Sequence, residues 1–173
     1  DNRLYIWQGD ITTLKCDAIV NACNSQMLGC FSPMHACIDN FIHTYAGIEL
    51  RLKMNEIMLE QGHEEETGKA KITSGYNLPA KYILHTVGPI IQWEVTREDE
   101  KLLAGCYREC MKLAADNGVK SIAFCCLSTG VFRFPQKRAA QIAVRTVKDF
   151  LDKILQDWKN KGLTLKQIDE GTY

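Results

Sequence analysis

Short apolar runs of strand length alternate with segments of helical periodicity along this chain, and this alternation restricts its possible folds most. The runs that predict strands cover residues 16–22, 71–76, 82–87 and 121–126, after a shorter apolar run at 4–7. Apolar runs bounded by turn residues and separated by helices are typical of strands in a sheet covered on both faces. The chain is therefore expected to adopt an α/β fold with helices on both faces of a mostly parallel sheet.

Three helices are expected between these runs. The first is long, because apolar residues recur at helical spacing from Ile38 to Leu52 and the pattern ends near 61–63. The second spans Leu103 to Leu113, and the third begins at Pro135, a favoured first residue of a helix. We expect one domain over 1–173, with 156–173 as a polar segment whose only suggestion of structure is a strand at 163–165.

Composition excludes several classes of protein. The chain has 173 residues, 21 basic and 21 acidic, and the formal net charge of zero argues against a nucleic-acid partner. No apolar stretch approaches the roughly 20 residues that cross a membrane, and charges near the N-terminus interrupt any signal-peptide pattern. Because the chain begins with Asp1 rather than Met, we expect it to be part of a longer protein.

Eight cysteines are many for a chain of this length, and several lie inside apolar runs. They are Cys16, Cys23, Cys30, Cys37, Cys106, Cys110, Cys125 and Cys126. A chain this long builds an ordinary core without disulfides, and a reduced cysteine behaves as a small buried hydrophobe. We therefore expect a reducing, cytoplasmic compartment and mostly structural thiols.

Two loops follow predicted strands and are the places where an α/β sheet binds ligands. One is 21–38 and the other is 127–135, which leads into the third helix. The small residues of the second loop suit a cradle of backbone N–H groups for a phosphate, although an ordinary strand-to-helix turn has the same composition. Arg133 in this loop is either an anion contact or a solvated surface residue.

The first loop contains two thiols and an imidazole within eight residues. Cys30, His35 and Cys37 have the spacing C-x4-H-x-C, and this donor set suits Zn²⁺. Three protein ligands leave one coordination position open, as a catalytic site requires. Chance proximity in a cysteine-rich chain is the alternative, and a fourth ligand from His43, His63 or His85 would make a closed structural site instead.

Asp39 and His43 are spaced i, i+4 at the start of the first helix and are expected on one face. Asp39 either complements the helix dipole or orients a water molecule toward a sugar carbon. His85, at the end of a predicted strand, is expected to be a hydrogen-bonded core residue.

Together these segments resemble a macrodomain. The motifs that carry the resemblance are residues 9–12, 17–24, 38–43, 85–89 and 128–132, in the family's order over about 4–155. The cysteines and histidine of the 30–37 segment resemble the zinc-containing branch that occurs beside sirtuin-type enzymes. The resemblance implies a three-layer α/β/α sandwich with a mixed central sheet that binds ADP-ribose. It also implies a zinc-dependent, glycosidase-type hydrolase that removes ADP-ribose from protein side chains.

The resemblance also implies roles for individual residues. Asp10 and Ile11 would contact adenine, and Asn24 would contact the distal ribose. The diphosphate would lie on the loop formed by Ser128, Thr129, Gly130, Val131 and Phe132. Cys30, His35 and Cys37 would hold zinc beside that ribose, Asp39 matches a carboxylate of related hydrolases, and Asn40 would help to hold water or ribose.

The family pattern is poorly matched by residues 162–173, where a strand leading to an aromatic contact with adenine is expected. The alternative function is a non-catalytic module that binds ADP-ribose or O-acetyl-ADP-ribose and contains a structural zinc. A structural zinc module without nucleotide binding is a third function, which the ordered motifs disfavour. The implied partners are an ADP-ribosylated protein and a sirtuin-type ADP-ribosyltransferase, with neither nucleic acid nor membrane.

Overall fold

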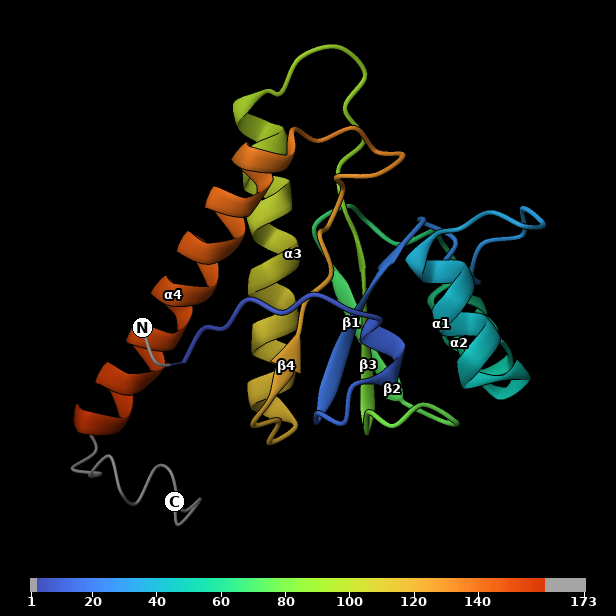
Figure 1. Cartoon of the computed structure of the whole chain (residues 1–173), viewed down its shortest axis with the longest axis horizontal. Coiled ribbons are helices and arrows are strands. Elements are labelled where there is room, and N and C mark those ends of the chain that lie inside the picture. The colour runs from blue at the N-terminus through green and yellow to red at the C-terminus, as the bar shows by residue number, and fades with distance from the viewer. Residues whose placement is uncertain (1–2, 161–173) are drawn as a thin grey trace.

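A four-stranded mixed sheet lies between two pairs of helices in a computed structural model that describes residues 3–160 (Figure 1). The strands are β1 (Ala18–Cys23), β2 (Ala70–Ser74), β3 (Tyr82–Val87) and β4 (Ile122–Ala123), in the spatial order β2-β3-β1-β4. Strand β1 pairs in parallel with β3 and β4, and β2 pairs antiparallel with β3. The expected α/β/α arrangement around a mixed sheet is confirmed.

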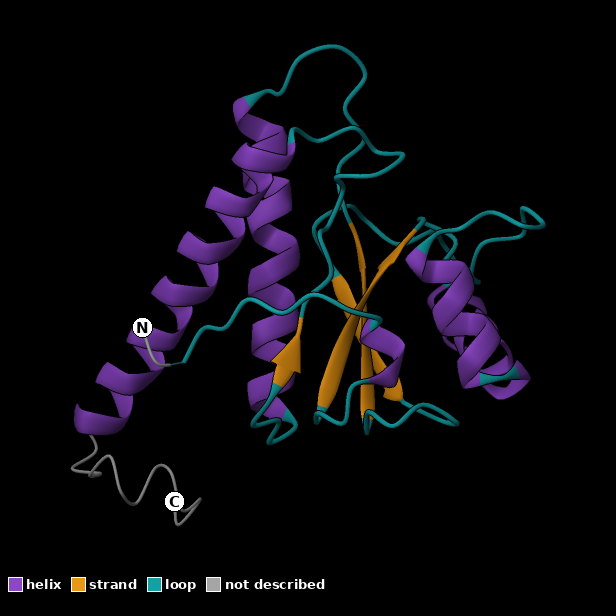
Figure 2. Cartoon of the chain, viewed as in Figure 1, coloured by secondary structure: helices purple, strands orange, loops and turns teal. Residues whose placement is uncertain are grey.

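The helices form the two outer layers (Figure 2). They are α1 (Ile38–Ala46) and α2 (Ile48–Gln61) on one face, and α3 (Arg97–Asp116) and α4 (Gln136–Asn160) on the other, with a short 3-10 turn η1 (Ile11–Thr13) beside α1. None of the helices in residues 3–160 is both long and apolar enough to cross a membrane.

The central strands are apolar on both sides because both faces are covered. Ala18 and Val20 of β1 pack with α3 and α4, whereas Ile19 between them packs with α1 and α2. In β3, Leu84 and Ile83 divide between the two cores in the same way. Full burial of each such aliphatic side chain stabilises the fold by about 1.5–3 kcal/mol, so the two cores fix β1 and β3 as a platform for the loops that follow.

Two local predictions are wrong. The long first helix is two helices, because Gly47 adopts φ 95° between α1 and α2, outside the helical region. The predicted strand at 121–126 is only the two-residue edge strand β4, because its other side has no strand partner among the described residues. The short apolar run at 4–7 is irregular, and Tyr5 and Ile6 are exposed.

The other elements agree with the prediction. Helix α3 begins at a capping box, in which the Thr96 side chain accepts from the Asp99 N–H and the Asp99 side chain accepts from the Thr96 N–H. The helix ends beside Gly118, as expected. Helix α4 follows Pro135 and continues to Asn160, so residues 156–160 of the polar segment are helical. The strand suggested at 163–165 lies outside the described residues.

Candidate functional site

The two loops singled out in the sequence follow parallel strands and therefore emerge at the same edge of the sheet (Figure 2). Residues 24–37 connect β1 to α1, and residues 124–135 connect β4 to α4. Helix α1 begins directly after the first loop, with Cys37 as its N-cap residue. The Cys37 side chain accepts a hydrogen bond from the Asn40 N–H, as the side chain of an N-cap residue does.

Cys30, His35 and Cys37 lie together. One potential ligand atom from each falls within 4.8 Å of the others, and Cys30 Sγ lies 3.3 Å from His35 Nδ1. Two ligand atoms on one tetrahedral zinc ion lie about 3.5–3.8 Å apart, given Zn–S and Zn–N bonds of about 2.3 and 2.1 Å. The arrangement and the donor set both fit this metal.

Local contacts shape residues 30–37, which we call the metal-type loop. The Asn40 side-chain amide donates to the His35 carbonyl oxygen at 2.9 Å, and the Asn40 backbone N–H donates to Cys37 Sγ at 3.4 Å. Within residues 3–160, no further Cys, His, Asp or Glu completes this cluster, so the fourth-ligand alternatives find no support in the described geometry. Three protein donors leave room for a non-protein ligand.

The two thiols differ in acidity. The hydrogen bond with His35 lowers the pKa of Cys30, whereas partial burial raises the pKa of Cys37. Cys30 is therefore the first of the pair to lose its proton, and the thiolate is the form that binds metals.

Asp39 is buried beneath this loop, with 4% of its surface exposed. Its Oδ1 accepts a 2.8 Å hydrogen bond from the side chain of Asn21, a residue of β1. Burial raises the pKa of Asp39 to about 6. Asn21 was not expected in the site, because only the pairing of strand and helix brings a residue inside β1 to the start of α1.

The expected proximity of Asp39 and His43 is confirmed, with His43 Nε2 3.5 Å from Asp39 Oδ1. Burial lowers the pKa of His43 to about 4, so the imidazole is neutral at pH 7 and the contact is not an ion pair. Among the described residues, neither nitrogen of His43 has a hydrogen-bond partner, nor does Asn21 Oδ1. Buried unpaired polar atoms of this kind are the partners that an ordered water needs.

His85 is a hydrogen-bonded core residue, as predicted. It is completely buried, with Nε2 2.8 Å from Thr73 Oγ1 and Nδ1 3.3 Å from the Asn21 side-chain nitrogen. Burial lowers its pKa to about 3, so this imidazole is also neutral.

The residues expected to contact adenine and the distal ribose also shape their own segments. Asp10 caps η1, since its Oδ1 accepts from the Thr12 N–H at 2.9 Å, and Ile11 begins that turn. Asn24 folds the start of the first loop: its Oδ1 accepts from the N–H groups of Gln26 and Met27. These side chains are therefore fixed by local hydrogen bonds.

The loop expected to hold the diphosphate has unusual backbone at its start. Ser128 has φ 62° and is buried, and its hydroxyl has no hydrogen-bond partner within residues 3–160. A Cβ built on Gly88 would lie 2.0 Å from Ser128 Oγ, so only glycine fits beneath it. The amides of Gly130, Val131 and Phe132 donate no hydrogen bond within the part of the chain that the structure describes.

This loop thus presents free donors next to the N-terminus of α4, an arrangement that suits an anion. Thr129 instead donates its hydroxyl to the Cys126 carbonyl oxygen at 2.9 Å. Arg133 is exposed with φ 61° and contacts neither the loop donors nor an acidic group among the described residues.

Comparison with known proteins agrees with the fold. The macro domain model matches residues 20–143, and the chain belongs to this family. A protein-ADP-ribose hydrolase of Treponema medium is 62% identical over 164 residues, covering 95% of this chain and 60% of the relative. One of Staphylococcus aureus strain MRSA252 is 60% identical over 168 residues, covering 96% of this chain and 60% of the relative.

A longer relative in Fusarium oxysporum has a name that lists two activities. It is called a probable bifunctional ADP-ribose hydrolase/ADP-ribosyltransferase and is 46% identical over 159 residues, 87% of this chain but 27% of the relative. The chain thus spans about 60% of the length of the two bacterial relatives and less of this one.

Solved structures show the same fold. The Oceanobacillus iheyensis macrodomain with MES bound has a TM-score of 0.75 and 41% identity, covering 84% of this chain and 75% of that one. The Trypanosoma brucei macrodomain in complex with ADP has a TM-score of 0.72 and 39% identity, covering 84% and 55%.

Proposed function

We propose that this chain is a zinc-dependent hydrolase that removes mono-ADP-ribose from modified protein side chains. The observation that carries the proposal is the group of Cys30, His35 and Cys37, which lie together in a loop at the carboxyl ends of the strands, where α/β sheets bind ligands. The names of the bacterial relatives support the same activity.

Cys30, His35 and Cys37 would hold the metal. When bound, Zn²⁺ at a site with an open position lowers the pKa of a bound water to about 7 or polarises a substrate hydroxyl. Their common loop begins with Asn24, the residue we assign to the distal ribose. The proposed metal centre and the sugar thus share one segment of chain.

Binding of the nucleotide is assigned to groups on neighbouring segments. Asp10 and Ile11 receive adenine, and the free amides of Gly130, Val131 and Phe132 receive the diphosphate. The unpaired Ser128 hydroxyl is available to the same anion, and Thr129 stabilises the turn through its bond to Cys126. A loop of N–H donors at a helix N-terminus binds phosphate without a dedicated cation.

The reaction is hydrolysis at the anomeric carbon of the distal ribose. The oxygen of a water molecule bonds to that carbon, and the bond from the carbon to the protein side chain breaks. Its electron pair leaves with the side chain, the water releases one proton, and the products are ADP-ribose and the unmodified protein.

Asp39 is assigned to orienting this water. Its carboxyl group lies beside His43 Nε2 and the Asn21 side chain, where Nε2 and Asn21 Oδ1 have no hydrogen-bond partner among the described residues, and an ordered water needs such partners. Asn40 is assigned an indirect role, because its side-chain amide donates to the His35 carbonyl oxygen and so holds the loop that bears the proposed metal ligands.

The test is release of ADP-ribose from a mono-ADP-ribosylated protein, with and without a chelator. We expect wild-type protein to release ADP-ribose, chelation to stop release and added zinc to restore it. A protein that binds ADP-ribose but releases none under any metal condition would contradict the proposal.

A second candidate function is a reader of ADP-ribose or O-acetyl-ADP-ribose in which zinc only shapes the loop. The burial of Asp39, with Asn21 as its donor, favours this alternative because it keeps the carboxylate from solvent. Calorimetry with ADP-ribose gives binding in both cases, so turnover alone separates the two functions.

A sirtuin-type ADP-ribosyltransferase is the proposed source of the modified substrate. The two activities in the name of the Fusarium oxysporum relative support such a pairing. The proposal is tested by supplying a protein modified by such a transferase and measuring its demodification.

A further inference from the structure

The two thiols and the imidazole of the metal-type loop are not anchored in the same way. Cys37 is held as the N-cap residue of α1, and the backbone of His35 is held by the Asn40 side chain. Residues 31–36 are all exposed, so packing in the core does not hold this stretch in place. What fixes Cys30 at the other end must therefore come from a different element.

Arg51, a residue of α2 outside the proposed catalytic and binding groups, contacts both neighbours of Cys30. Its guanidinium carbon lies 4.6 Å from the centre of the Phe31 ring. A Cβ built on Gly29 would lie 3.1 Å from one guanidinium nitrogen, so the Gly29 backbone also packs closely against Arg51. One cation thus contacts the residue on each side of the thiol.

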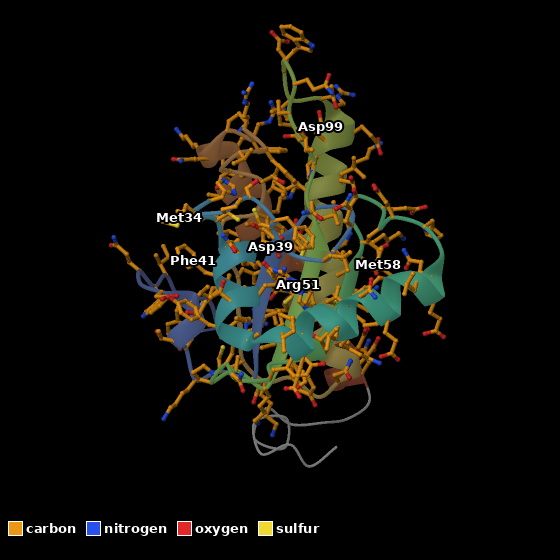
Figure 3. The ribbon with its side chains drawn as sticks, turned by 90° about the vertical axis from the view of Figure 1, so that its right-hand side faces the viewer. Met34, Asp39, Phe41, Arg51, Met58 and Asp99 are labelled. Atoms are coloured by element: carbon orange, nitrogen blue, oxygen red, sulfur yellow. The ribbon has the colours of Figure 1, made fainter. Side chains whose placement is uncertain are left out.

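Arg51 makes no hydrogen bond and no ion pair in the part of the chain that the structure describes. It lies in the first turns of α2, where a positive charge gains least from the helix dipole. Arg51 lies close to His43, since both approach the same Cβ position of Gly29. Figure 3 shows Arg51 on α2 and Asp39 on α1, the two helices that pack together on this face.

His43 closes the Cβ side of Gly29 together with Arg51. Gly29 is buried with φ 87°, and its Cβ position lies 2.8 Å from His43 Cγ. His43 therefore limits movement of the segment toward α1, while stacking on Arg51 holds Phe31 over α2.

We propose that Arg51 is a positioning residue of the metal centre: its guanidinium stacks on Phe31 and packs against Gly29, which keeps Cys30 within reach of His35 and Cys37. This inference rests on the proposed zinc site. A planar guanidinium on an aromatic face is a directional contact, and outer contacts that orient a metal ligand change metal affinity by about 10–100-fold. Since one of three ligands is affected, we expect the lower end of that range.

The experiment measures Zn²⁺ affinity by competition with a chromophoric chelator, together with the thiolate-to-cobalt absorption of Co²⁺-loaded protein. We expect Arg51→Met and Phe31→Leu each to weaken zinc binding by about tenfold. The double variant should bind no more weakly than Arg51→Met alone, because Arg51→Met already removes the contact with Phe31. Phe31→Tyr should bind as wild type, since the ring is retained.

Two exposed residues supply matched controls. Lys53→Met removes a cation of the same helix that forms an ion pair with Glu56, and Phe41→Leu removes a ring that stacks on Tyr45 instead of Arg51. Both should leave zinc affinity and the cobalt spectrum unchanged. Thermal melting of each metal-free variant reports folding; Phe31 is 61% exposed, so Phe31→Leu should fold as wild type.

The outcomes separate the two proposals. Wild-type protein that binds no zinc would overturn the metal centre, and with it this inference. Wild-type protein that binds zinc, with Arg51→Met and Phe31→Leu binding as tightly, would overturn the role of Arg51 alone.

Discussion

Acidification should destabilise this protein through two buried histidines. Burial lowers the pKa of His43 to about 4 and that of His85 to about 3. In the unfolded chain both histidines titrate near 6.5, so below that pH the unfolded state binds protons that the folded state does not bind. The stability that these groups contribute is present above pH 6.5 and is lost as the pH falls toward the folded values.

The magnitude follows from linkage. Between pH 7 and pH 5 each histidine loses about 1.9 kcal/mol, or about 4 kcal/mol together, at about 1.36 kcal/mol per pKa unit. Asp39 acts in the opposite sense, because burial raises its pKa to about 6 and the folded state gains its proton first. That gain is about 1.3 kcal/mol at pH 5, which leaves a net loss of about 2.5 kcal/mol.

Urea unfolding of chelator-treated protein at pH 7 and pH 5 measures this difference. The lower limit of pH 5 keeps Asp10, Asp17 and Asp152 ionised, since hydrogen bonds lower their pKa values. The exposed His63 offers the control, and His63→Gln should show the same loss as wild type. Equal or greater stability at pH 5 would refute the assignment of neutral buried imidazoles.

Three substitutions test the loops. Gly88→Ala should weaken ADP-ribose binding at least tenfold in calorimetry, because the added Cβ would lie 2.0 Å from Ser128 Oγ. Adding Ser128→Ala to this variant should restore part of the affinity. Unchanged binding by Gly88→Ala would contradict the diphosphate assignment. Gly29→Ala should lower the free energy of unfolding by about 1–3 kcal/mol, since a side chain at φ 87° would strain the backbone and press on His43; urea unfolding within 0.5 kcal/mol of wild type would count against that packing. Asp39→Asn should reduce turnover by about 10²-fold or more while ADP-ribose affinity changes less than threefold; retained turnover would remove Asp39 from the reaction.

The parts of the fold that the sequence predicts are those set by local pattern. The strands β1 and β3 follow from uninterrupted apolar runs, and α3 and α4 follow from apolar residues at helical spacing. The break at Gly47 is missed because apolar residues continue at helical spacing across it from Tyr45 to Leu52, although α2 leaves Ile48 and Leu52 exposed. Periodicity reports a possible face, and only packing decides whether that face is buried.

The candidate site divides in the same way. Cys30, His35 and Cys37 are close in sequence, so their grouping is predictable from one loop, and the structure brings them together. Asn21 and Arg51 are missed because their roles depend on contacts between a strand, a loop and two helices. An asparagine inside an apolar strand is the one local signal that a buried polar network is present.

Metal-dependent turnover tests the central claim most directly. ADP-ribose release should be measured for wild type and His35→Ala on a mono-ADP-ribosylated protein, with the zinc content of each determined in parallel. His35 is exposed, so its removal takes one ligand without opening a core. The account predicts that wild type contains zinc and releases ADP-ribose, and that His35→Ala has lost both while still binding ADP-ribose. Wild-type turnover by a zinc-free His35→Ala protein would contradict it.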